Sequence, residues 1–559
     1  MSDPADLALP PVLDPPDHDR TAPDRAVPDD PAGVQESAAV RKPAGAPGPE
    51  RLYAPEHVRA PEHRRGSEQP PAPEPVLDPA DGAFARDPYP YYAALRSQGP
   101  VTRVALANGT HAWLVTGYEQ SRAVLADPRF SNVPPQGAGR HKPDSPAQRA
   151  RACLARHMLN SDAPDHSRLR RLTAAAFAPR RVDALRPRIA RLTDGLIADV
   201  AARLEDGGTA DLVDAFAFPL PVLVIGEVLG VPEEDRGDLR RWTYRVGSPA
   251  DALERGAVDE AWTSLYGYFT GLIAEKRRRP GEDLFSALVH DSSEGGLDDG
   301  ELLAMAFLLL FAGYETTMNL LASASLLLLA HPRELEAALR EGPGRWAAVV
   351  EETLRHASPL EGTTWRRTTE EVDLGGGAVV PAGASVLAVL AAANRDPSRY
   401  PDPDAFRPER YVAGSGAHLS AASGAGSGRG PDGDSMSGLS MSGLSVDGSG
   451  IDGSGMDGSG MDGSGMDGSG ADCSGADVSD AGGAGAAGGQ RRAAPHVAFG
   501  HGPHFCVGSR LARLEAAIAL PRLFAAFPGL RLAADPAELP YRPGLLVRGP
   551  RRVPVTAAR

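Results

Sequence analysis

Cysteine is scarce in this chain, which contains 3 cysteines among 559 residues. Cys153, Cys473 and Cys506 are too few and too scattered for a disulfide framework, so the composition fits a reducing compartment. The first residues, Met-Ser-Asp-Pro-Ala-Asp, lack the basic and then apolar run of a signal peptide. We therefore expect a cytoplasmic protein.

Long basic blocks and long uninterrupted apolar runs are also missing. Without a basic block of the kind that binds nucleic acid, we expect no nucleic-acid partner. The most apolar stretch, residues 302–330, is interrupted by Glu315 and two threonines, whereas a membrane span needs about 20 consecutive apolar residues. This stretch therefore predicts a helix buried in a large domain, and no membrane partner.

The net charge of −15 is concentrated in two segments of biased composition. Residues 1–80 hold 18 of the 52 prolines and carry 15 acidic against 8 basic residues, and residues 413–490, mostly Gly, Ser, Ala and Asp, carry 10 against 1. The remainder has a net charge of +1, so the acidity says nothing about a substrate. We predict a disordered tail over 1–80, one folded domain made of 83–412 and 491–559, and a low-complexity insertion over 413–490.

A long insertion is compatible with one domain. Lengthening a loop from about 12 to about 90 residues costs only about 2 kcal/mol of closure entropy. The five-residue repeat from Asp447 to Met466 differs from the nine-residue period of calcium-binding repeats, which favours a flexible loop over a calcium site.

The most concentrated chemistry lies in residues 499–515. Within ten residues the chain places Gly500, His501, Gly502, His504, Cys506 and Gly508, and a helical pattern begins directly afterwards. Dense glycines let a bulky group approach the main chain. A helix N-terminus is expected to lower the pKa of a neighbouring thiol and to favour the thiolate, the form that ligates a metal.

The segment Phe499-Gly500-x-Gly502-x-His504-x-Cys506-x-Gly508, followed by Leu511-Ala512-Arg513, resembles the haem-binding signature of the cytochrome P-450 superfamily in its soluble bacterial form. The resemblance implies a mostly α fold with a minor β part, in a single large haem domain. It implies haem b (iron protoporphyrin IX) as cofactor, Cys506 as the axial ligand of the iron, and cofactor contacts from Phe499, Gly500, His504 and Gly508. A zinc site of His501, His504 and Cys506, which lacks a fourth ligand, and a buried structural cysteine are the alternatives.

A second motif lies inside the apolar stretch. Asp298 and Glu301 have the spacing of a capping box, which predicts the start of a long helix over 298–330. Within it, Ala312-Gly313-Tyr314-Glu315-Thr316-Thr317 resembles the oxygen-binding motif of the same family. The resemblance implies that Thr316 hydrogen-bonds dioxygen and that Glu315 relays protons. The alternative is a buried, salt-bridged glutamate.

Two further segments fit propionate binding. His166 and Arg170 are four apart and share one helix face, which could hold an anionic group. In the family these positions bind a haem propionate, and the alternative is a solvated basic face. Arg366 falls where the family has another propionate-binding arginine. Arg367 is its alternative, because strand alternation turns only one of the two inward.

A third group has a structural role in the family. Glu352 and Arg355 lie three apart on one helix face and lock the core together with a later arginine, for which we favour Arg410 over Arg407.

Coarse patterns predict the remaining elements. We expect strands at 101–106, 112–115, 363–372, 530–532 and 545–549, and helices at 119–126, 346–356 and from 510 to about 523. Residues 131–165, 225–260 and 358–364 are expected to line a substrate pocket.

The resemblance implies a monooxygenase that cleaves O2 and hydroxylates or epoxidises a small organic molecule such as a secondary metabolite. Its electrons would come from ferredoxin and ferredoxin reductase, and Arg168, Arg171, Arg180 and Arg181 would form the docking surface. We expect a monomer. The alternatives are a peroxide-driven haem-thiolate enzyme, which would not need Glu315 and Thr316, and a non-catalytic haem sensor or carrier.

Overall fold

The computed structural model describes residues 74–107, 109–134, 145–153, 156–247, 256–290, 296–412 and 495–557. The chain divides into two units, Met1–Pro71 and Ala72–Arg559, and every described residue belongs to the second. The predicted insertion over 413–490 lies outside the described residues. Of the predicted tail only 74–80 is described, and it contains strand β1 (Val76–Leu77), so order begins earlier than residue 83.

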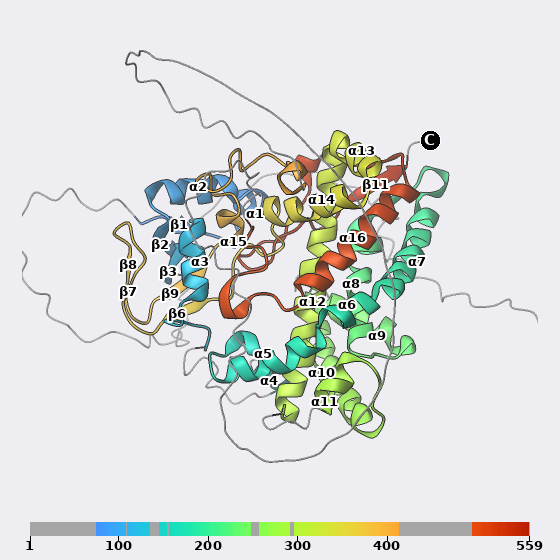
Figure 1. The fold of residues 1–559 in the computed structure, drawn as a ribbon, viewed down its shortest axis with the longest axis horizontal. Coiled ribbons are helices and arrows are strands. Elements are labelled where there is room, and N and C mark those ends of the chain that lie inside the picture. The colour runs from blue at the N-terminus through green and yellow to red at the C-terminus, as the bar shows by residue number, and fades with distance from the viewer. Residues whose placement is uncertain are drawn as a thin grey trace, which may run out of the picture. The chain divides into compact units, whose positions relative to one another are not determined.

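The second unit is mostly helical, as predicted (Figure 1). Its longest helix is α12 (Asp299–Ala330). The other α-helices are α1 (Gly82–Arg86), α2 (Tyr89–Gln98), α3 (Tyr118–Ala126), α4 (Pro146–Cys153), α5 (Asp165–Ala176), α6 (Pro179–Ala184), α7 (Arg186–Leu204), α8 (Pro219–Val228), α9 (Arg236–Gly247), α10 (Ala257–Arg278), α11 (Leu284–Val289), α13 (Pro332–Glu341), α14 (Pro343–His356), α15 (Leu390–Ala393) and α16 (Ser509–Ala526).

The strands of the described residues form three small sheets. A six-stranded sheet has the order β1-β2-β3-β9-β6-β4, with β2 (Val101–Leu106) and β3 (His111–Val115) forming the predicted antiparallel hairpin. Its other members are β4 (Phe130–Ser131), β6 (Arg366–Thr368) and β9 (Ser385–Ala388). A three-stranded sheet joins β10 (Leu530–Leu532), β11 (Pro554–Ala557) and β5 (Thr209–Asp211), and a two-stranded sheet pairs β7 (Val372–Asp373) with β8 (Val379–Val380).

Helix α12 is the axis of the main core. Its first turn carries the predicted capping box, because the Asp298 side chain accepts from the Glu301 backbone N–H and Glu301 accepts in return. It packs against α8, α14 and α16, and Figure 1 shows it running alongside α16. By length and composition α12 could cross a membrane, yet 67% of its most apolar window is buried inside the protein. An all-round apolar helix at the centre of a large domain has this burial.

Two strand predictions are wrong in extent. Residues 545–549 form no strand, and Val547 makes only an isolated bridge to Leu360. The strand that closes the domain is β11, which pairs with β10 and β5. The predicted strand over 363–372 is divided into β6 and β7, because the chain turns between them.

Candidate functional site

The loop that carries Cys506 is held in place by backbone contacts. It contains the short 3-10 helix η7 (Gly502–His504) and leads directly into α16. The Cys506 N–H donates to the Phe499 carbonyl oxygen at 2.9 Å. Gly502 has a φ of 70°, and a Cβ there would lie 2.7 Å from the Leu125 carbonyl oxygen. Glycine therefore lets this loop pack tightly against α3.

The surroundings of Cys506 shift the pKa of its thiol. Its residue is accessible to solvent, yet desolvation by the surrounding protein is the largest influence on the thiol and raises its pKa. A backbone hydrogen bond from Gly508 and the charges of Arg170 and Arg513 oppose this rise. The expectation that the helix N-terminus would lower the thiol pKa is thus wrong for the protein alone, because desolvation outweighs the helix end.

A group of nitrogen-bearing side chains gathers beside this loop. The rings of His166, from α5, and His504, from η7, lie 4.0 Å apart between centroids. Arg366 of β6 is buried, whereas its neighbour Arg367 is exposed. Of the two arginines between which strand alternation left the choice open, Arg366 is therefore the one that faces inward. Three of these buried nitrogens have no hydrogen-bond partner: His166 Nε2, His504 Nδ1 and Arg366 Nε.

Electrostatics in this group favour an anion. Desolvation first, and then the charges of Arg366 and Arg170 together with His166, lower the pKa of His504 to about 3, so its ring is neutral at pH 7. Desolvation followed by Arg170 also lowers the pKa of His166. Desolvation lowers the pKa of Arg170, and the charge of Cys506 acts on it in the opposite direction.

The buried nitrogens without hydrogen-bond partners and the neighbouring arginines fit the propionate groups of a haem bound next to Cys506. A buried donor without a partner costs about 1–3 kcal/mol, and a bound carboxylate would satisfy it. Sequence reasoning missed Asn132, whose Nδ2 lies 2.7 Å from His504 Nε2 and which helps to orient that ring. Among the residues that the structure describes, no group of three His, Cys, Asp or Glu side chains could hold a metal ion, so the zinc alternative has no site there.

The acid and hydroxyl of the second motif lie in an unbroken stretch of α12. The Thr316 hydroxyl donates to the Ala312 carbonyl oxygen at 2.8 Å, which is the backbone bond expected of a threonine inside a helix. Glu315 forms an ion pair with Arg542, with 2.9 Å between Oε1 and Nη1, and its side chain is 23% exposed. The glutamate is therefore salt-bridged but not fully buried. The partner, Arg542, was not foreseen because it lies 227 residues away in the sequence.

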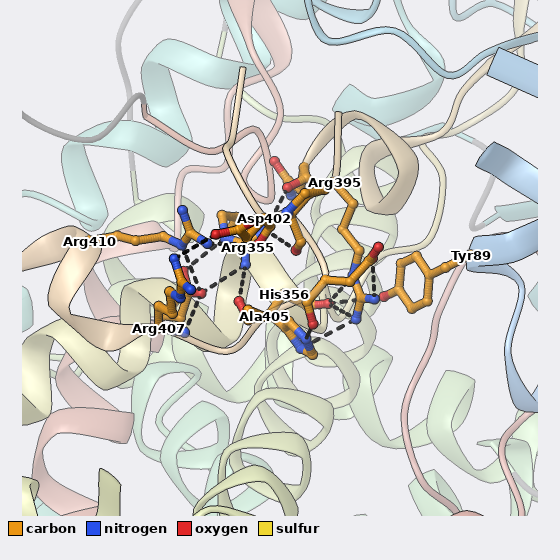
Figure 2. Close-up of polar contacts among 12 residues, drawn as sticks. Tyr89, Arg355, His356, Arg395, Asp402, Ala405, Arg407 and Arg410 are labelled. Carbon is orange, nitrogen blue, oxygen red and sulfur yellow. Dashed lines mark hydrogen bonds and ion pairs between the residues drawn. The ribbon is translucent and has the colours of Figure 1, made fainter. Parts of the chain in front are cut away.

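Glu352, Arg355 and Arg410 come together as the structural triad, and Figure 2 shows Arg355 and Arg410 within the surrounding polar contacts. Arg355 donates from Nε and Nη2 to the two Glu352 oxygens at 2.8 Å each, and both side chains are fully buried. Arg410 Nε lies 3.4 Å from Glu352 Oε1, close enough for an ion pair but without hydrogen-bond geometry. Arg407 reaches Glu352 only through its backbone N–H and pairs instead with Asp402. The side-chain partner is thus Arg410.

The predicted docking arginines do not all remain on the surface. Arg171, Arg180 and Arg181 are exposed. Arg168 is ion-paired with Glu301 of the α12 capping box, so it ties α5 to α12 and is not part of an open basic surface.

Comparisons with known proteins place these features in context. A sequence profile described as Cytochrome P450 matches residues 346–425 and 485–552. The chain is 39% identical over 488 residues to the cytochrome P450 monooxygenase PikC of Streptomyces venezuelae, covering 87% of this chain and 95% of the relative. It is 34% identical to 6-deoxyerythronolide B hydroxylase of Saccharopolyspora erythraea, covering 86% and 98%. Among solved structures, the tirandamycin C-bound P450 monooxygenase TamI aligns with a TM-score of 0.64 at 33% identity, over 87% of this chain and all of that one.

Proposed function

Because the chain belongs to the cytochrome P450 family, we propose that it hydroxylates or epoxidises a secondary metabolite, with electrons from ferredoxin and ferredoxin reductase. It is a cytochrome P450 monooxygenase, and its cofactor is a haem-thiolate iron. The substrate class rests on the relatives, one of which is a 6-deoxyerythronolide B hydroxylase and another a tirandamycin C-bound enzyme. We further propose a cytoplasmic monomer with one haem domain over the predicted 83–412 and 491–559, extended on its N-terminal side to include β1.

One observation supports the cofactor assignment above all: the Cys506 thiol lies in the same site as His166, Arg170, Arg366 and His504. In the proposal the Cys506 thiolate would hold the haem iron. Arg366 and the neutral rings of His166 and His504 would donate to the propionates, and Arg170 would add positive charge. Phe499, Gly500 and Gly508 shape the loop around the thiolate, and Glu352, Arg355 and Arg410 hold the core of the scaffold together.

The haem-thiolate group supplies the activation of dioxygen, and the protein supplies binding, proton delivery and exclusion of water. Glu315 takes a proton from solvent on its carboxylate and passes it toward Thr316. The Thr316 hydroxyl, now bonded to the Ala312 carbonyl, can turn and donate to a polar ligand on its open side. This pair of side chains favours the monooxygenase over a peroxide-driven enzyme or a haem carrier, which would not use them.

The test is turnover with labelled oxygen. Purified protein, ferredoxin, ferredoxin reductase and NADPH would be incubated under 18O2 with those metabolites that displace water from the ferric protein in a spectral titration. We expect one labelled oxygen atom in the product. A product that forms only with added peroxide would support the peroxide-driven enzyme, and no oxidised product from any binding metabolite, with any electron donor, would support the carrier.

A further inference from the structure

A cavity of about 460 Å³ lies next to the oxygen motif of α12. Tyr314 and Met318 of α12 form one wall. The remaining walls are formed in part by Asp214 of the π-helical turn η3 (Val213–Ala217), by Tyr244 of α9 and by Arg542 of the segment between β10 and β11. A cavity of this size with charged and phenolic walls can hold several waters, because each finds polar partners there.

Arg542 connects this cavity to Glu315. It lines the cavity and also donates from Nη1 to Glu315 Oε1 at 2.9 Å. The backbone N–H of Arg542 donates to the Gly549 carbonyl oxygen at 3.4 Å, and Tyr541 forms a bridge with Pro550. The loop that carries the guanidinium is therefore closed at its base, which restricts the positions that Arg542 can take.

The contact between Arg542 and Glu315 affects the pKa of the glutamate. Desolvation raises the pKa of the Glu315 carboxyl, and Arg542 opposes the rise. Burial, followed by the charge of Glu315, raises the pKa of Tyr314, so that phenol stays neutral. The other titratable or charged groups of the cavity wall are Asp211, Asp214, Tyr244 and Arg551. Arg542 is thus the cation that favours the ionised form of Glu315, the form that can accept a proton.

We propose that protons reach Glu315 through this cavity and that Arg542 is a positioning residue for Glu315. The inference rests on the proposed relay role of Glu315. A hydronium ion in the cavity gives its proton to the Glu315 carboxylate, which forms a carboxyl O–H bond, leaves a water molecule and weakens the pair with Arg542. When the carboxyl passes that proton toward Thr316, the carboxylate forms again and the ion pair with Arg542 closes.

The first test is an infrared titration of Glu315 in the haem-loaded protein. Difference spectra against Glu315→Gln identify the carboxyl band, and the pH at which it disappears is compared among wild type, Arg542→Gln and Arg542→Lys. We expect this pH to rise in Arg542→Gln, because desolvation then acts unopposed, and to stay close to wild type in Arg542→Lys. The matched control is Arg531→Gln, an exposed arginine of β10 in the same C-terminal region. An unchanged band in Arg542→Gln would overturn the assignment.

The second test is kinetic. In Arg542→Gln we expect kcat to fall about tenfold with KM changed less than about twofold, and the solvent isotope effect on kcat to increase. Free guanidinium ion should restore the rate of Arg542→Ala, because it can enter through the cavity, and should not help the double variant that also carries Glu315→Gln. No recovery in correctly loaded Arg542→Ala would contradict the cavity route.

These outcomes separate this inference from the proposed function. If Glu315→Gln turns over at the wild-type rate, the relay role of Glu315 is wrong. If Glu315→Gln is slow but Arg542→Gln behaves like Arg531→Gln in both tests, only the role of Arg542 is wrong.

Discussion

Replacing Arg355 by methionine should lower the free energy of unfolding more than replacing any exposed charged residue. Arg355 and Glu352 have no exposed side-chain surface, and Arg355 donates two bonds to Glu352. It also donates to the carbonyl oxygens of Asn394, Pro403 and Ala405 at 2.8–3.1 Å. Removing one partner of a buried ion pair costs about 3–5 kcal/mol, because the other charge is left without compensation. We therefore expect Arg355→Met to lose at least that much free energy of unfolding.

Urea unfolding followed by far-UV circular dichroism measures the loss. The matched control is Arg340→Met on α13, whose ion pair with Glu341 is solvent-exposed and should contribute less than about 1 kcal/mol. The double variant Glu352→Gln with Arg355→Met should recover only part of the lost free energy of unfolding. The three carbonyl oxygens still lose the guanidinium of Arg355, and the Arg407 N–H still loses the charged carboxylate of Glu352. If Arg355→Met were as stable as Arg340→Met, the reasoning about this triad would be refuted.

Three further predictions concern the site and its surroundings. Thr316→Ala should lower product formation about 10- to 100-fold and divert electrons to released peroxide, measured as peroxide per NADPH oxidised, and full peroxide-independent turnover would contradict the role of Thr316. Arg366→Leu should speed haem transfer to an acceptor protein about tenfold or more, while its exposed neighbour Arg367→Leu serves as the control and should not. Desolvation, and then the charge of Arg395, hold the pKa of His356 in the folded protein well below its unfolded value of about 6.5. The stability that this histidine contributes is therefore fully present above about pH 6.5 and is lost as the pH falls below that value, because the unfolded chain then binds a proton that the folded protein does not. His356→Gln should therefore lose less unfolding free energy than wild type between pH 7 and pH 5.5 in urea titrations, and an equal loss would contradict that sign.

Local patterns predicted the elements well where a few neighbouring residues determine the structure. The capping box of Asp298 and Glu301, the hairpin of β2 and β3, and the start of α16 just after Cys506 all depend on short-range spacing. The inward position of Arg366 follows from strand alternation once one face of β6 is known to be buried.

Tertiary contacts explain what the sequence did not reveal. The ion pair of Arg542 with Glu315 and the contact of Asn132 with His504 join residues hundreds of positions apart, for which no local pattern exists. The direction of the Cys506 pKa was wrong because desolvation depends on the packed surroundings and not on the neighbouring helix end. Residues 545–549 are apolar enough for a strand, yet Val547 makes only an isolated bridge to Leu360, and β11 is the strand that joins β10 to β5.

The identity of the iron ligand is the central claim, and a carbon-monoxide difference spectrum tests it most directly. The purified, reduced wild-type protein should contain haem and give the spectrum characteristic of a thiolate-ligated iron. Cys506→Ser should lose that spectrum, whereas Cys153→Ser, a control on α4, should keep it. Wild-type protein without porphyrin, or a Cys506→Ser variant with an unchanged spectrum, would contradict the account.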